Sequence, residues 1–172
     1  VSGAVLHQRL KLALKFFGPD TLRKLTKFYM PMGRRVIVIG GGIQGCELAE
    51  FLTKRGRSVT VVETKNTIGE GMVDALLSNL LKWFRKMGVT LIPGVKEYVE
   101  ITDRGLTIVT ADGRTQTLEA DSIVTALPLT PNDELLGRLK EKVAEVYAIG
   151  DCRDPLLIAD AIGMGLRTAL EV

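Results

Sequence analysis

The sequence predicts an α/β fold, a three-layer domain on a parallel sheet in which an antiparallel β-meander replaces one crossover helix. Three observations support this prediction. Short apolar runs alternate with helical segments between residues 36 and 92, three short alternating runs fill residues 95–119, and further apolar runs follow at 121–127 and 145–150. Alternating β-α-β units form parallel sheets with right-handed crossovers, whereas short strands joined by tight turns form antiparallel sheets.

The first half of the domain alternates between strand and helix. Gly56 and Gly88 stand just after the two helical segments, where glycine commonly ends a helix. The expected elements are strand 36–39, helix 43–55, strand 58–63, helix 74–87 and strand 89–92.

The second half begins with the meander of residues 95–119. Its runs are KEYVEI, LTIVT and TQTLEA, and Asp112-Gly113 is a hairpin signal between the last two. The apolar character of the next two runs is typical of strands buried in a parallel sheet. The remaining expected elements are strand 121–127, a helical stretch at 133–141, strand 145–150 and a final helix at 155–170.

Residues 1–33 form a basic helical leader ahead of this domain. Residues 4–17 place leucines at helical spacing with basic residues between them, and residues 20–30 indicate a second short helix with Asp20 as its N-cap. A basic amphipathic segment can lie on a membrane or on a partner protein. For residues 4–30 we favour a third, purely structural interpretation, in which the leader covers a neighbouring domain.

The charge is uneven along the chain. Residues 1–35 carry eight basic residues and one acid, a net charge of +7, whereas residues 36–172 carry fifteen basic and nineteen acidic residues, a net charge of −4. The basicity therefore belongs to the leader. The domain behind it has no basic stripe of the kind that binds nucleic acid.

Length and composition indicate a soluble globular protein with one full hydrophobic core. The chain has 172 residues, of which 46% are hydrophobic and 25% charged. No apolar run reaches the roughly 18 residues of a membrane span, and no signal peptide is visible. Cys46 and Cys152 lie far apart without a CxxC, which favours a cytoplasmic location over a disulfide framework or a zinc site. Because the chain begins at Val1, we expect it to be part of a longer polypeptide.

The stretch VIVIGGGIQGCELAEFL contains a G-x-G-x-x-G motif between a strand and a helix. Its first glycine permits a tight turn, its second lets a pyrophosphate approach the backbone, and its third lets the helix pack closely on the strand. Free N–H groups and a partial positive charge at the helix start attract the phosphates. The motif predicts a Rossmann-type dinucleotide site. Its candidate cofactor-binding residues are Gly40, Gly41, Gly42, Ile43, Gln44 and Gly45.

Glu63 stands 23 residues after Gly40, at the end of the second expected strand. A carboxylate at that place can accept hydrogen bonds from the ribose hydroxyls of an adenosine, and it repels a 2′-phosphate. The sequence therefore favours NAD(H) over NADP(H), although the cations of Lys65 and Arg57 nearby weaken this preference.

A second group of interest lies in VYAIGDCRDPLLIADAIGMGLRTAL, residues 146–170. A strand ends there in Gly150-Asp151, and a helix follows. The spacing alone leaves Asp151 open between a cofactor contact and the cap of a strand end.

These segments together resemble the pyridine nucleotide–disulfide oxidoreductase superfamily over about residues 34–170. The matching features are VIVIGGGIQGCELAEFL, the acid-ended VTVVE, the meander, DSIVTALPLTPNDELL and VYAIGDC. Within that superfamily, GDCRDPLLIADAIGMGLRTAL is similar to the C-terminal portion of the Old-Yellow-Enzyme-like NADH:flavin oxidoreductases. That group includes 2-enoate reductases, 2,4-dienoyl-CoA reductases and trimethylamine dehydrogenase.

The resemblance implies an NAD(H)-binding domain at residues 34–145, inserted between two parts of an FAD-binding domain. Residues 146–172 would then be the returning segment of the FAD-binding domain. The upstream FAD fingerprint, an FMN barrel and the cysteines of an iron–sulfur cluster would lie outside this chain, since two isolated cysteines cannot build a cluster.

The resemblance also implies roles for three residues outside the glycine loop. Gly150 and Asp151 would contact FAD, the aspartate through the ribitol, and Glu47 would lie close to the nicotinamide. A second interpretation of Glu47 is an exposed acid stabilised by the helix dipole. The family pattern Ala-Thr-Gly is broken here by Leu127-Pro128, which puts a cofactor contact at that crossing in doubt.

The resulting hypothesis is an NADH-binding part of a cytoplasmic flavoprotein oxidoreductase. It would position NADH for hydride transfer to FAD and serve the reduction of an activated C=C bond, in an enoate or enoyl-CoA, elsewhere in the protein. Its partners would be the N-terminal domains of the same polypeptide and small-molecule cofactors. No residue has the pattern of a proton donor or metal ligand, and His7 lacks catalytic partners. Two alternatives stay open, an NADH:acceptor reductase of the ferredoxin or rubredoxin type and an NADH-sensing regulatory module.

Overall fold

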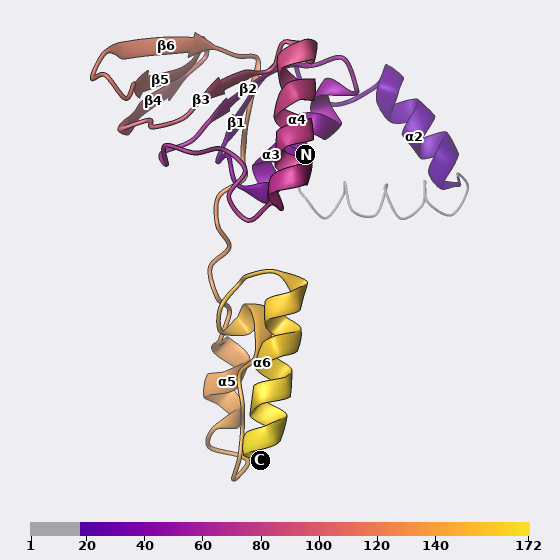
Figure 1. Ribbon diagram of the computed structural model, residues 1–172, viewed down its shortest axis with the longest axis vertical. Coiled ribbons are helices and arrows are strands. Elements are labelled where there is room, and N and C mark those ends of the chain that lie inside the picture. Colours follow the sequence, from indigo (N-terminus) through magenta and orange to yellow (C-terminus); the bar gives the residue numbers. More distant parts are fainter. Residues whose placement is uncertain (1–17) are drawn as a thin grey trace. The chain divides into compact units, whose positions relative to one another are not determined.

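The computed structural model describes residues 18–172, which form two compact units that divide between Leu127 and Pro128 (Figure 1). The first unit contains both sheets, and the second contains helices α5 and α6. The helix expected at 4–17 and His7 lie outside the described residues. The domain boundaries expected after residues 33 and 145 stay predictions.

A parallel sheet of four strands is the centre of the first unit, and its strand order is β3-β2-β1-β7. Strand β1 pairs in parallel with β2 on one side and with β7 on the other, and β2 pairs in parallel with β3. These pairings confirm the predicted parallel sheet. The strands are β1 Arg35–Ile39, β2 Ser58–Val62, β3 Thr90–Ile92 and β7 Ser122–Thr125.

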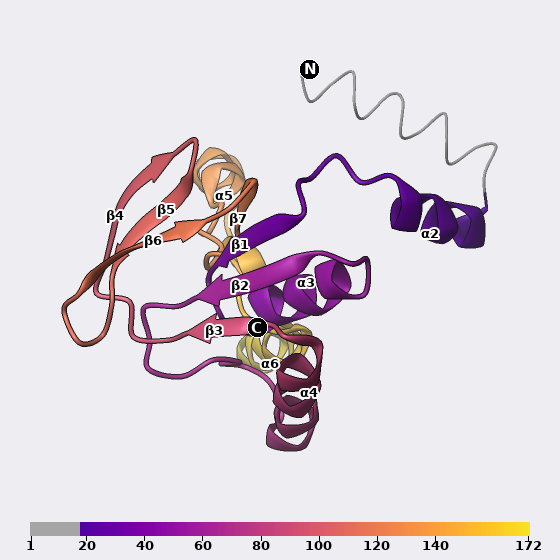
Figure 2. The ribbon, with the colours of Figure 1, turned by 90° about the horizontal axis from the view of Figure 1, so that it is seen from above.

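The side chains of β1 alternate between two hydrophobic clusters, one on each face of the sheet. Val36 and Val38 pack into the cluster that includes residues of α3 (Ile43–Thr53) and α4 (Asp74–Met87). Ile37 and Ile39 pack into the cluster shared with the antiparallel sheet. A strand buried on both faces is apolar at every position, which is why this run shows no alternation of polarity. Helices α3 and α4 and the antiparallel sheet thus cover opposite faces (Figure 2).

The antiparallel sheet follows β3 and consists of β4, β5 and β6 in that order. Leu106 and Ile108 of the middle strand are buried against the parallel sheet. Gly113, in the turn before β6, has φ +85°, as the Asp-Gly hairpin signal predicts. The predicted meander is therefore confirmed. Its strands are β4 Glu97–Thr102, β5 Gly105–Val109 and β6 Thr115–Glu119.

Several predicted helix ends differ from the structure, among them the start of the final helix, which is Ile158 and not residue 155. Helix α2 runs over Pro19–Phe28 with Gly18 as its N-cap, so the prediction of Asp20 as N-cap was wrong, and Asp20 lies in the first turn. Proline is favoured at the first helical position because its missing N–H has no intrahelical partner there anyway. Helix α3 ends at Thr53, two residues early. Helix α4 ends as predicted, with Gly88 in the left-handed conformation.

The second unit contains α5 (Glu134–Leu139), a 3-10 turn at Gly150–Cys152 and α6 (Ile158–Glu171). The strand predicted at 145–150 is absent, so this prediction was wrong. A strand needs hydrogen-bonded neighbours, and residues 128–172 contain no other strand. Residues 145–149 are therefore left without regular structure.

Candidate functional site

Two glycines of the loop between β1 and α3 are required by the fold. Gly40 has φ +107°, and a Cβ there would lie 2.3 Å from the carbonyl oxygen of Ala126. A Cβ on Gly45 would lie 1.8 Å from the carbonyl oxygen of Gly40. The positive φ of Gly40 allows the tight turn, and its contact shows how closely the turn approaches the chain after β7. The contact of Gly45 shows that α3 lies against the end of β1. The roles predicted for these two positions are both supported.

Gly42 differs from its neighbours, because no protein atom crowds it. Its φ of −68° and ψ of −170° suit any residue, and the nearest atom to a Cβ there is the carbonyl oxygen of Glu70, at 3.7 Å. Neither strain nor packing explains a glycine at this position. The space beside it is thus available for a ligand to approach the main chain.

The N-terminus of α3 presents unpaired amide donors. Among the described residues, no protein group accepts a hydrogen bond from the N–H of Gly42, Gln44 or Gly45. The N–H of Ile43 is occupied, because it donates to the carbonyl oxygen of Glu70 at 3.0 Å. The N–H groups of Gly40 and Gly41 are occupied as well, by Val62 and Glu63. Unpaired donors at a helix N-terminus attract anions, so the other three amides are available for the predicted phosphate contact.

Gly41 has a packing role that the G-x-G-x-x-G motif does not indicate. A Cβ there would lie 2.6 Å from Cδ1 of Ile68 and 3.0 Å from Cβ of Glu63. The carbonyl oxygen of Gly41 also accepts a hydrogen bond from the N–H of Gly69, at 2.6 Å. The loop after β2 therefore packs on the glycine loop through the side chain of Ile68 and the main chain of Gly69 and Glu70. The signal for this was the glycine pair at 69 and 71, which have φ values of +86° and +87°.

Glu63 lies one residue beyond β2, and its carboxylate connects that strand end to the glycine loop. Oε2 accepts a hydrogen bond from the N–H of Gly41 at 2.6 Å, and Oε1 accepts from the N–H of Lys65 at 2.9 Å and from the hydroxyl of Thr64 at 3.0 Å. Burial alone would raise the pKa of Glu63, but these hydrogen bonds outweigh it and hold the pKa below its ordinary value. The carboxylate is therefore ionised at neutral pH and fixed beside the amide donors.

Of the two cations considered near Glu63, only Lys65 is at this end of the strand. Arg57 precedes the amino end of β2, and the five residues of that strand separate it from Glu63, which places the two Cα atoms roughly 20 Å apart. Arg57 therefore does not bear on the choice between NAD(H) and NADP(H). Lys65 forms an ion pair with Glu70.

Cys46 and Glu47 follow the loop on the first turn of α3. Cys46 is fully buried, and burial, together with the charges of Glu47 and Glu63, raises the pKa of its thiol to about 11. The thiol stays protonated, which supports a packing role. Glu47 is exposed, and its position near a nicotinamide stays a prediction.

Gly150 and Asp151 belong to the second unit of the chain, whereas the glycine loop belongs to the first. Gly150 has φ +65° and opens the 3-10 turn. Asp151 is exposed and lines a hollow of about 420 Å³ together with Thr130 and Asn132. The rest of its lining is mainly apolar, with Leu129, Leu135 and Pro155. The contact of Asp151 with FAD stays a prediction.

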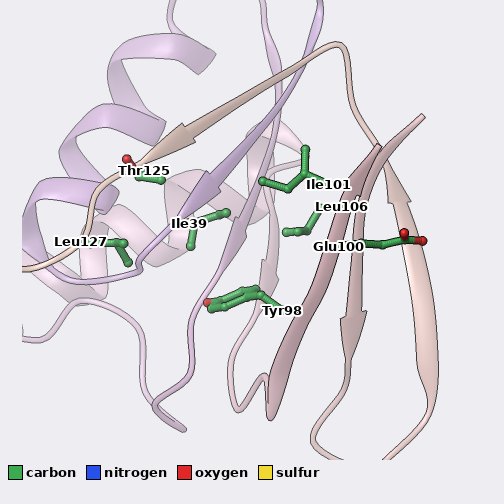
Figure 3. A pocket seen from close by; sticks show the side chains of 7 residues that line it. All are labelled: Ile39, Tyr98, Glu100, Ile101, Leu106, Thr125 and Leu127. Atoms are coloured by element: carbon green, nitrogen blue, oxygen red, sulfur yellow. The ribbon is translucent and has the colours of Figure 1, made fainter. Parts of the chain in front are cut away.

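An apolar pocket of about 230 Å³ opens where β1 and β7 end, between the parallel sheet and the meander (Figure 3). Leu127, which interrupts the family pattern, contributes its side chain to this pocket. Burial and the charge of Glu63 raise the pKa of Tyr98, which therefore stays neutral. The lining residues are Ile39, Tyr98, Glu100, Ile101, Leu106, Thr125 and Leu127.

The parallel sheet, the glycine loop before α3 and the acid after β2 together define a dinucleotide-binding domain of the Rossmann type. The chain belongs to the pyridine nucleotide-disulphide oxidoreductase family, whose model matches residues 6–165. Membership of this family implies NAD(P)H and FAD as cofactors. The members of this family are oxidoreductases.

Three relatives confirm the resemblance to enoate-reductase-like flavoproteins. An NADH oxidase of Thermoanaerobacter brockii is 33% identical over 138 residues, which are 80% of this chain and 21% of the relative. A cinnamate reductase of Clostridium sporogenes is 31% identical over 147 residues, 82% of this chain and 21% of the relative. A solved 2-naphthoyl-CoA reductase superposes with a TM-score of 0.73 at 29% identity, over 83% of this chain and 22% of that one.

The chain spans about a fifth of the length of each of these relatives. None of the helices within residues 18–172 is long and apolar enough to cross a membrane.

Proposed function

We propose that this chain binds NADH and positions it for hydride transfer to FAD in a longer flavoprotein that reduces an activated C=C bond. One observation carries the proposal: the unpaired amides at the N-terminus of α3 directly follow Gly41, whose N–H is hydrogen-bonded to the ionised Glu63. These amides belong to Gly42, Gln44 and Gly45. The site thus combines donors for a diphosphate with an acceptor for ribose hydroxyls. When bound, the nicotinamide supplies the hydride and FAD accepts it.

The residues of the chain provide binding and orientation. The three amides would hold the pyrophosphate, and the absence of a side chain on Gly42 lets it come close to the main chain. Glu63 would accept hydrogen bonds from the adenosine ribose. Its negative charge disfavours a 2′-phosphate, so the site prefers NADH to NADPH.

The substrate class is proposed from the relatives. Two of them are named cinnamate reductase and 2-naphthoyl-CoA reductase, which supports an enoate or an enoyl-CoA-like thioester as substrate. The substrate site would then lie elsewhere in the full protein, together with any FMN or iron–sulfur cluster. Relatives named nitric oxide reductase FlRd-NAD(+) reductase favour a second candidate, an NADH:acceptor reductase. One from Escherichia coli is 30% identical over 137 residues, 70% of this chain and 36% of the relative.

The experiment uses the full-length protein, mixed with NADH or NADPH without oxygen while flavin absorbance is followed. We expect NADH to bleach the flavin with a second-order rate constant at least about tenfold above that of NADPH, because placing like charges together costs 1.4 kcal/mol or more. If neither NADH nor NADPH lowers the flavin absorbance, the proposal is rejected. A preference for NADPH would remove Glu63 from its role. Reoxidation by cinnamate or an enoyl-CoA, rather than by a rubredoxin or flavodoxin, separates the two candidates.

We further propose that residues 146–172 are the returning segment of the FAD-binding domain. Between Pro128 and Val172 only Gly150 is buried, so this unit has no core of its own. Helix α6 exposes an apolar stripe at every fourth residue, and burying one such side chain contributes about 1.5–3 kcal/mol. A missing surface of the FAD domain would cover this stripe. Its residues are Ile158, Ile162, Leu166 and Leu170, with exposed fractions of 82%, 67%, 63% and 79%.

Leu166→Asp in the full-length protein is expected to lower the FAD content strongly, because a carboxylate in the stripe cannot be buried without a partner. FAD released by heat and measured by fluorescence provides the readout. The matched control is Leu76→Asp on α4, since Leu76 is 62% exposed and lies outside the stripe. Equal FAD content in both variants would show that the stripe faces solvent in the complete protein.

A further inference from the structure

The loop between β2 and α4 carries an ion pair beside the proposed adenosine end of the site. Nζ of Lys65 contacts Oε2 of Glu70, and the two side chains are 58% and 60% exposed. The main chain of Lys65 is held on both sides. Its N–H donates to Glu63 at 2.9 Å, and its carbonyl oxygen accepts from the N–H of Gly94 at 2.9 Å. The backbone of Lys65 is therefore fixed next to Glu63, and the ion pair with Glu70 sets the direction of the Lys65 side chain.

The carboxylate of Glu70 is not what fastens this loop to the glycine loop. The carbonyl oxygen of Glu70 accepts the N–H of Ile43 at 3.0 Å, and the N–H of Gly69 donates to Gly41 at 2.6 Å. Both attachments are made by the main chain. The side chain of Glu70 can therefore be neutralised without detaching the loop.

Three charges surround the proposed ribose position, namely Glu63, Glu70 and Lys65, with a sum of −1. If Glu70 were neutral, the sum would be zero and the ammonium of Lys65 would be free two residues from Glu63. A free cation at this place is what recognises a 2′-phosphate.

We propose that Glu70 is a positioning residue for nucleotide specificity, which rests on the proposed function. It holds Lys65 in an ion pair and so withholds the cation that a 2′-phosphate would need. Selectivity for NADH then depends on two carboxylates. Glu63 acts directly on the ribose, and Glu70 acts through Lys65.

Calorimetric titration of the protein with NAD⁺ and NADP⁺ tests this inference. Glu70→Gln is expected to tighten NADP⁺ binding about fivefold, the scale of one exposed ion pair, with NAD⁺ binding within about twofold of wild type. The double variant Lys65→Ala/Glu70→Gln is expected to lose the gain. Raising the salt concentration should shrink the gain, because exposed charges are screened. Glu50→Gln is the control, since it breaks the Glu50–Lys54 pair on α3 and should change neither affinity.

The outcomes separate this inference from the proposed function. If the wild-type protein binds neither nucleotide, the proposed function fails. If it binds NAD⁺ but Glu70→Gln shows no gain for NADP⁺, only the role of Glu70 is overturned. A gain that persists in the double variant overturns it too, because the loss of one negative charge would then suffice without Lys65. Thermal unfolding of each variant shows that the fold is retained.

Discussion

Replacing Gly42 by alanine is expected to weaken NADH binding by roughly a hundredfold, about 2.8 kcal/mol at 1.4 kcal/mol per factor of ten. An alanine Cβ would occupy the space through which a diphosphate approaches the amides of Gln44 and Gly45. The fold has no reason to reject it, since the nearest protein atom would be 3.7 Å away and the φ of −68° suits alanine. Alanine is a poor N-cap, so we expect a loss in the free energy of unfolding below about 1 kcal/mol.

Titration calorimetry with NADH and urea unfolding would measure the two quantities on the same protein. Binding at wild-type strength in Gly42→Ala would mean that the cofactor does not lie on this loop. A large loss of stability would instead assign Gly42 a structural role like that of its neighbours.

Gly45→Ala is expected to have the opposite profile, with a destabilisation of at least about 3 kcal/mol. Its Cβ would lie 1.8 Å from the carbonyl oxygen of Gly40, so either α3 or the end of β1 has to move. NADH binding should fall as well, because the movement displaces the amide donors. The decisive quantity is the urea midpoint.

Gly137→Ala in α5 is the matched control for Gly45→Ala. It also replaces a helical glycine, but no atom lies within 4 Å of its Cβ, so the helix propensity of alanine should stabilise by up to about 1 kcal/mol. If Gly45→Ala were as stable as wild type, the close approach of α3 to β1 would be excluded.

The three glycines of this motif therefore have different expected roles. Gly40 and Gly45 are needed by the protein itself, for a turn with φ +107° and for a helix packed on a strand end. Neither the turn nor the helix packing requires a glycine at position 42. The fold thereby places unpaired amides next to an open space, with an ionised carboxylate fixed at the edge.

Much of the first unit could be predicted because its signals are local. The apolar runs at β1 and β2, the helix between them and the Asp-Gly turn of the meander each depend on residues close in the sequence. The strand predicted at 145–150 failed for the opposite reason. Its apolar pattern is that of a strand, but pairing needs neighbours that residues 128–172 do not contain.

The sequence by itself determined the fold class, the family, the glycine loop and the acid that follows β2, since each is encoded in the spacing of nearby residues. The tertiary structure alone decided how that loop is held. Ile68, Gly69 and Glu70 pack or bond to it across more than twenty residues, and the ion pair of Lys65 lies in the same segment. Such contacts leave no periodic pattern, because they depend on where the chain returns in space and not on the residues beside them.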